Sequence, residues 1–234
     1  MDRATQSDWS LEESVARLKR LHYVLRRVHE MMTARITSEP IYELKTAYSH
    51  HAYLCAEQVS WIRGRVGEMR EPPLGLDKIP HVGLELLMDE VNAAGTTEEF
   101  LIGIYQVVLP AVTAACDRLK RQAHPLADAP TVRIARLIEF ELADVMIFGD
   151  QAVSCLEDER QHAAHQPWID HLLACLLVAG LVDGTQPSTD PLPKRWPRDT
   201  AEAYVKEPRR DERFQDPFNA GVNPEVFLYD ESFS

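Results

Sequence analysis

Imidazole and carboxylate side chains interrupt the apolar stripes of three predicted long helices. His22 and His29 occupy a stripe with alternating four-and-three spacing in the first helix. His50 and Glu57 share a face in the second helix, and Glu141 lies on an apolar face of a later one. A buried polar group without a partner costs roughly 1–3 kcal/mol, so such groups on separate helices should meet one another. The pattern predicts that these side chains converge inside the molecule.

These residue types suit a metal ion. His29, His50, Glu57 and Glu141 offer two nitrogen and two carboxylate ligands, which is enough for one Fe, Mn or Zn ion. His50 and Glu57 are two turns apart, about 10.5 Å along the helix axis, so we expect one to bind the metal and the other to support it. Tyr105, on the apolar face of the third long helix, is the candidate catalytic residue that would line the pocket.

A metal-free interpretation of the same residues stays open. His22 and His29 would then hydrogen-bond to Glu57, Glu141 or Tyr105 across the bundle, forming a buried polar network that fixes the helix register. The pair His162 and His165 also has metal-ligand spacing, but its segment is strongly polar and predicts a solvated face. No glycine-rich phosphate loop, nucleophile elbow or zinc-finger spacing appears in the sequence.

The elements that must position these residues are helices. Ser10 and Glu13 form a capping box, and the first helix should run to about residue 36. Further helices are predicted at about 40–70, 82–95, 96–122, 131–155 and 167–180, and Pro110 should kink the third long one. Almost no strand pattern is present. The sequence therefore predicts an all-α fold, with four long helices in a bundle and shorter accessory helices.

The sequence changes character after residue 184, where prolines, charge runs and scattered aromatics replace the apolar stripes. We expect a helical domain over 1–184 and an extended C-terminal arm over 185–234. The arm should pack on the bundle or on a partner subunit, because its aromatic residues need a surface to cover them: Trp196, Tyr204, Phe214, Phe218, Phe227 and Tyr229. Packing on a partner would make a homodimer.

Composition limits the partners and the compartment. A formal charge of −12 argues against binding to nucleic acid or to an anionic membrane surface. No run of about 18 apolar residues predicts a transmembrane helix, and the N-terminus lacks a secretory signal. The four cysteines lie far apart within helical patterns, which is typical of reduced thiols. We expect a cytoplasmic protein.

The chain resembles the ferritin-like superfamily of four-helix bundles. The resemblance rests on helix order and on two stretches, "HHAYLCAEQVSWIRGRVGEMR" (50–70) and "HPLADAPTVRIARLIEFELADVMIFGD" (124–150), and it spans roughly residues 10–180. Members that bind two irons use a Glu-x-x-His pair on two helices. Here Ser60 follows Glu57 and Asp144 follows Glu141 at the histidine positions, so neither pair is intact. The resemblance implies a ferritin-like bundle with a remodelled metal site.

Two functional hypotheses follow. The first is a ferritin-like oxidoreductase that acts on a small organic substrate in the bundle core, with iron or manganese bound there. The second is a metal-free ferritin-like scaffold without a cofactor, serving as a small-molecule or partner-binding protein or as a cofactor-independent enzyme. The inward Glu and His residues favour the first, and the broken Glu-x-x-His pairs favour the second.

Overall fold

The computed structural model describes residues 10–69, 75–124, 126–198 and 206–214, and every regular element in these ranges is a helix. The prediction of an all-α chain is confirmed over these residues. The helices are α1 (Leu11–Arg35), α2 (Tyr42–Met69), α3 (Val82–Asn92), α4 (Thr97–Leu101), the π-helix η1 (Ile102–Val108), α5 (Leu109–Gln122), α6 (Ala129–Leu156), α7 (Glu159–Ala164) and α8 (Gln166–Val178).

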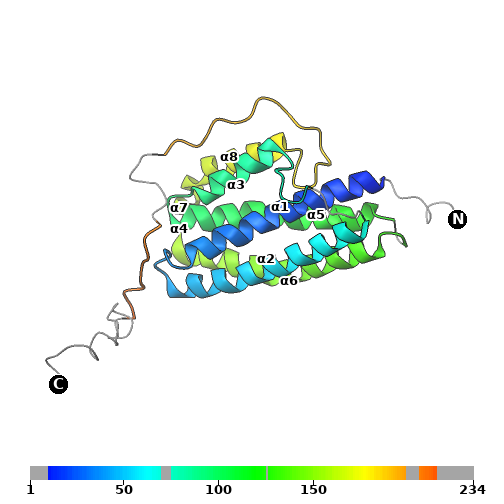
Figure 1. The fold of residues 1–234 in the computed structure, drawn as a ribbon. Coiled ribbons are helices and arrows are strands. Elements are labelled where there is room, and N and C mark those ends of the chain that lie inside the picture. Colours follow the sequence, from blue (N-terminus) through cyan, green and yellow to red (C-terminus); the bar gives the residue numbers. More distant parts are fainter. Residues whose placement is uncertain (1–9, 70–74, 125, 199–205, 215–234) are drawn as a thin grey trace, which may run out of the picture.

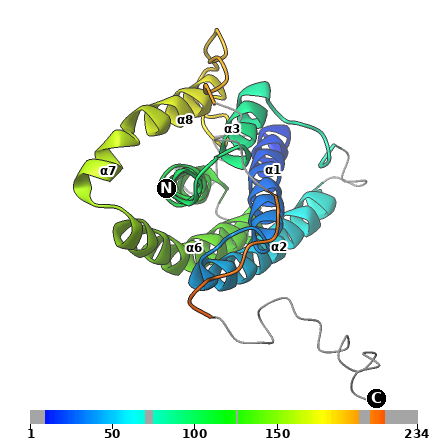
Figure 2. The same ribbon diagram turned by 90° about the vertical axis from the view of Figure 1, so that its left-hand side faces the viewer.

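The segment α4–η1–α5 runs through the middle of the molecule, and the other helices surround it (Figures 1 and 2). Neighbouring helices pack in the pairs α1–α2, α2–α6, α5–α6, α3–α8 and α1–α3. This central segment, Thr97–Gln122, is long and apolar enough to cross a bilayer by length and composition, although the sequence predicted no such helix. Its most apolar window is 67% buried inside the fold, as expected for a core helix.

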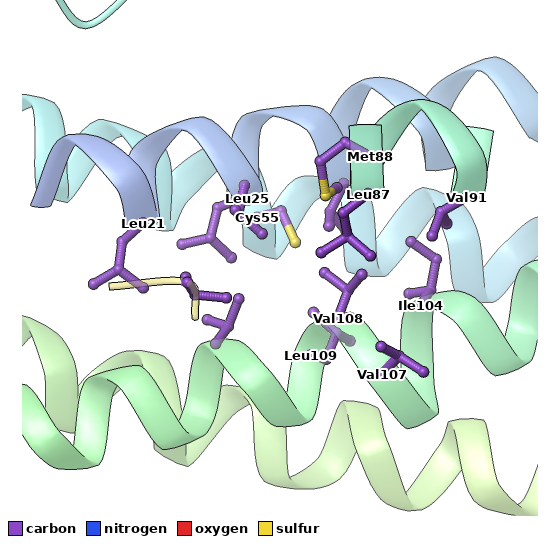
Figure 3. Packing of buried hydrophobic residues seen from close by; sticks show 14 of the residues in the cluster. Leu21, Leu25, Cys55, Leu87, Met88, Val91, Ile104, Val107, Val108 and Leu109 are labelled. Carbon is purple, nitrogen blue, oxygen red and sulfur yellow. The ribbon is translucent and has the colours of Figure 1, made fainter. Parts of the chain in front are cut away.

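Aliphatic side chains from α1, α3 and the central segment form the core. Leu21 and Leu25 of α1 and Leu87 and Met88 of α3 point toward the central helix, where Val108 faces them (Figure 3). All five side chains are at most 1% exposed. The apolar face of the third long helix, on which the sequence analysis placed Tyr105, is buried; its members are Ile102, Tyr105, Leu109, Val112 and Cys116.

Local sequence explains where the helices begin and end. The Ser10–Glu13 capping box forms as predicted at the start of α1. Thr96 accepts a hydrogen bond from the Glu99 backbone N–H and so begins α4. After α8, Gly180 adopts φ +72°, a conformation that favours glycine and stops the helix.

The predicted kink at Pro110 takes the form of a π-helix that ends just before the proline. Leu109 N–H bonds to the Ile104 carbonyl, five residues earlier. Pro110 has no N–H, and its ring would clash with the carbonyl four residues before it in an α-helix. The wider π turns relieve this clash, and they rotate Tyr105 relative to the residues that follow.

The described parts of the C-terminal arm contact the bundle of the same chain. Trp196 packs edge-on against Trp168 of α8, and Arg198 pairs with Glu99 of α4 at 3.1 Å. Further on, Arg213 pairs with Glu43 at the start of α2. The predicted arm aromatics Tyr204, Phe218, Phe227 and Tyr229 lie outside the described residues.

Candidate functional site

A buried polar pair lies where η1 meets α2 and α6. The Tyr105 hydroxyl from η1 is hydrogen-bonded to Nδ1 of His51 from α2 at 2.8 Å. Tyr105 is 1% exposed and His51 is 5% exposed. Burial, followed by the charge of His50, lowers the pKa of His51 to about 4. Burial also raises the pKa of Tyr105 well above its usual value. Both groups are therefore neutral at pH 7, and a single hydrogen bond joins the two uncharged side chains.

Gly149 of α6 permits the position of the Tyr105 ring. A Cβ atom at residue 149 would lie 2.2 Å from Tyr105 Cγ, far inside van der Waals contact. Phe148, the residue before it, packs edge-on against His51 with ring centroids 5.3 Å apart. The π-helix, the missing side chain at Gly149 and the aromatic contact together fix one position for the tyrosine.

The four predicted metal ligands do not come together. Nδ1 of His29 lies 2.9 Å from the Ala52 carbonyl oxygen, a main-chain partner. The side chain of His50 is exposed, and Glu57 is only partly buried. Glu141 accepts a hydrogen bond from Gln58 Nε2 at 2.8 Å.

Within the described residues, no group of three or more His, Cys, Asp or Glu side chains is placed to hold a metal ion. The residues present therefore do not fit the iron or manganese site that the ferritin-like resemblance implies. No chemical step is derived through a metal at His29, His50, Glu57 and Glu141.

The partners predicted for the metal-free network also differ from those observed. His22 is 1% exposed, and neither of its ring nitrogens has a hydrogen-bond partner among the described residues. Its burial, with Arg26 and Arg63 nearby, lowers its pKa to about 4. Tyr105 does join a buried hydrogen bond, but its partner is His51, which was not among the site residues predicted from the sequence.

The histidine pair near the end of the fourth long helix is not simply a solvated face. α6 ends at Leu156, and His162 and His165 fall on and just after the short helix α7. Their Nδ1 atoms lie 3.1 and 2.8 Å from the two carboxylate oxygens of Glu157, whose side chain is 2% exposed. Because the segment is polar in composition, the burial of Glu157 could not be predicted from the sequence. This buried carboxylate anchors the turn between α6 and α7.

An open apolar groove lies beside the buried pair, between the start of α2 and the end of α6. Its volume is about 600 Å³, within the range of ordinary ligand sites. Five residues with apolar side chains form its floor and walls: Ile41, Leu44, Phe148, Ala152 and Leu156. Phe148 thus faces the groove and also contacts His51, so the groove and the His51–Tyr105 pair are separated by one aromatic ring.

Charged and polar groups line the rim of the groove. Glu43, Gln151, Cys155 and Arg213 contribute to it, and Arg213 pairs with both Glu43 and Asp211. The hydrogen bonds from Arg213 and from the Tyr42 backbone N–H hold the pKa of Asp211 well below its usual range. The arm therefore supplies one edge of the groove, held by ion pairs to α2.

Comparison of the chain with protein-family models, with curated proteins and with solved structures finds no match.

Proposed function

We propose that this protein binds a small, mainly apolar molecule in the groove between α2 and α6. The observation that carries the proposal is the groove itself: a volume of about 600 Å³, lined by five residues with apolar side chains and by the four residues Glu43, Gln151, Cys155 and Arg213. Ligand sites commonly combine a mainly apolar lining with a few fixed polar groups. This function corresponds to the metal-free small-molecule binder considered from the sequence.

The lining defines the class of ligand. Ile41, Leu44 and Leu156 present aliphatic carbon, and Phe148 presents an aromatic ring. Each Å² of apolar surface removed from water contributes about 25 cal/mol, so a rigid hydrocarbon or aromatic body is favoured. Gln151 and the Glu43–Arg213 ion pair at the rim suit a ligand with one polar group at its end.

The scaffold that we propose for this site is a ferritin-like bundle without a working metal centre. Four long helical segments support that interpretation: α1, α2, α4–η1–α5 and α6, with α1 beside α2 and α5 beside α6. The proposed metal ligands His29 and Glu141 instead bond to Ala52 and Gln58. The oxidoreductase hypothesis therefore lacks a ligand set on which to rest, and the binding function does not require one.

The test is to block the groove with a large side chain at one of the residues that line it. Ala152 lines the groove, whereas Ser60 on α2 is exposed and does not line it, so Ala152→Trp is compared with Ser60→Trp. The probe is 1-anilinonaphthalene-8-sulfonate, which has an apolar ring system and one anionic group. We expect the unmodified chain and Ser60→Trp to bind it with similar affinity, and Ala152→Trp to bind it at least about tenfold more weakly, a loss of about 1.4 kcal/mol.

Circular dichroism of both variants ensures that the helices are intact. Equal binding by Ala152→Trp and Ser60→Trp would place the probe elsewhere on the protein. Absence of binding by the unmodified chain would likewise contradict the proposal.

A further inference from the structure

The outer face of α6 carries a five-residue stripe that has no partner within the described chain. The residues are Arg136, Phe140, Ala143, Ile147 and Asp150, with alternating spacing of four and three, and all five are exposed. Spacing of this kind places side chains along one face of a helix, in the pattern that helices use to pack against each other. Figures 1 and 2 show α6 on the outside of the bundle, beside α2 and α5.

The apolar members of the stripe are unusually exposed. Phe140 is 75% exposed and Ile147 is 57% exposed. Both project from the middle of a 28-residue helix, seven residues apart, which is about 10.5 Å along the axis. Large apolar side chains that are this exposed and share one face are typical of an interaction surface.

The stripe is complementary to itself when read in the opposite direction. From one end it presents a cation, a large apolar residue, a small residue, a large apolar residue and an anion. A second α6 running antiparallel, with the two-fold axis at Ala143, would place Arg136 opposite the second copy's Asp150 and Phe140 opposite the second copy's Ile147. A two-fold interface needs this property, because each contact must occur twice. Ala143 at the axis allows the two helices to approach closely.

The charges on this face also favour a second copy over another kind of partner. Arg133, Arg136, Asp144 and Asp150 give the face no net charge, whereas the chain carries −12 and would repel itself elsewhere. None of the ion pairs between described residues involves these four side chains. We propose that α6 forms an antiparallel two-fold interface with α6 of a second copy of this chain.

This interface is separate from the ligand groove. Ala152 and Phe148 line the groove on the α2 side of the helix, while the stripe lies on the outer side. The proposal of a ligand groove and the proposal of a dimer can therefore be contradicted independently of one another.

The experiment measures molar mass by sedimentation velocity over a range of concentrations. Ile147→Glu is compared with Leu177→Glu, because Leu177 on α8 is also 57% exposed and lies on another face. We expect the unmodified chain and Leu177→Glu to have twice the chain mass of 26.6 kDa. Ile147→Glu should sediment as a monomer, with a dissociation constant raised at least about tenfold.

Charge reversal tests the antiparallel register. Arg136→Asp or Asp150→Arg alone should weaken the dimer at least about tenfold, because each places like charges opposite one another twice. The double variant Arg136→Asp/Asp150→Arg restores opposite charges and should recover the dimer. A monomeric unmodified chain, a dimeric Ile147→Glu variant, or a double variant as weak as the single ones would each overturn the proposal.

Discussion

Replacing Gly149 with alanine should destabilise the protein even though alanine is the better helix former. The new Cβ would lie 2.2 Å from Tyr105 Cγ, 2.3 Å from its Cβ and 2.5 Å from its Cδ1. These atoms are near the tyrosine main chain and cannot swing aside while the hydroxyl keeps its bond to His51. Overpacking of this kind typically costs about 1–3 kcal/mol.

Two glycines of α2 provide the control with the opposite sign. A Cβ at Gly64 or at Gly67 would meet nothing within 4 Å. Gly64→Ala should therefore stabilise the protein by roughly 0.5–1 kcal/mol, through helix propensity alone. Urea unfolding followed by circular dichroism gives both free-energy changes on one scale.

A double-mutant cycle identifies the clash as the cause. In a Tyr105→Gly background both the ring and the Cβ atom of residue 105 are gone, so adding Gly149→Ala should no longer destabilise the protein. If Gly149→Ala stabilises the protein as Gly64→Ala does, or if its cost persists without the ring, the close packing of Tyr105 on α6 is wrong.

Two further predictions concern pH and the end of α8. The folded pKa of His51 is about 4, below its usual 6.5, so its contribution to stability is complete above pH 6.5 and is lost as pH falls toward 4. His51→Asn should remove up to about 3 kcal/mol of that pH dependence in urea unfolding, and His50→Asn should reduce it only in part, because burial is the larger of the two causes. Arg20 donates hydrogen bonds to the carbonyls of Ala179, Leu181 and Val182, so Arg20→Leu should cost about 1–3 kcal/mol. Exposed Arg121→Leu serves as its control, and equal melting temperatures for the two would contradict this role.

The helices could largely be predicted from the sequence because their ends carry explicit local signals. Ser10 with Glu13 begins α1, and Gly180 follows the end of α8. Pro110 indicated a distortion, but its form could not be predicted, since a π turn depends on what the central helix packs against. Tertiary contacts with Gly149 and His51 decide that packing.

The candidate site was harder to predict because α2 offers two apolar stripes. The helix face shared by His50 and Glu57 was interpreted as the inward one, whereas Leu54 and Trp61 on that face only flank the core. The buried stripe is Leu44, Tyr48, His51, Cys55, Gln58 and Ile62, also with four-and-three spacing. The two stripes differ by a small rotation of the helix, which the contacts with α1 and α6 settle.

The contribution of the C-terminal arm to the groove is another feature that could not be predicted from the sequence. Arg213 of the arm pairs with Glu43 at the start of α2. That the same arginine also forms the rim of a groove depends on α2 and α6 lying side by side, which no local pattern reveals.

The binding of a ligand in the groove is tested most directly at Cys155. All four cysteines lie within the described residues; Cys55, Cys116 and Cys175 are buried, and Cys155 alone is exposed and lines the groove. Burial raises the pKa of each of the three buried thiols to about 12, so a thiol reagent at neutral pH should modify Cys155 first.

The measurement is the rate at which 5,5′-dithiobis(2-nitrobenzoate) modifies Cys155, with and without saturating 1-anilinonaphthalene-8-sulfonate. A molecule bound in the groove should slow this reaction at least about tenfold in the unmodified chain, because it covers the thiol. An unchanged rate while the probe is bound would show that the ligand lies elsewhere and would contradict the account.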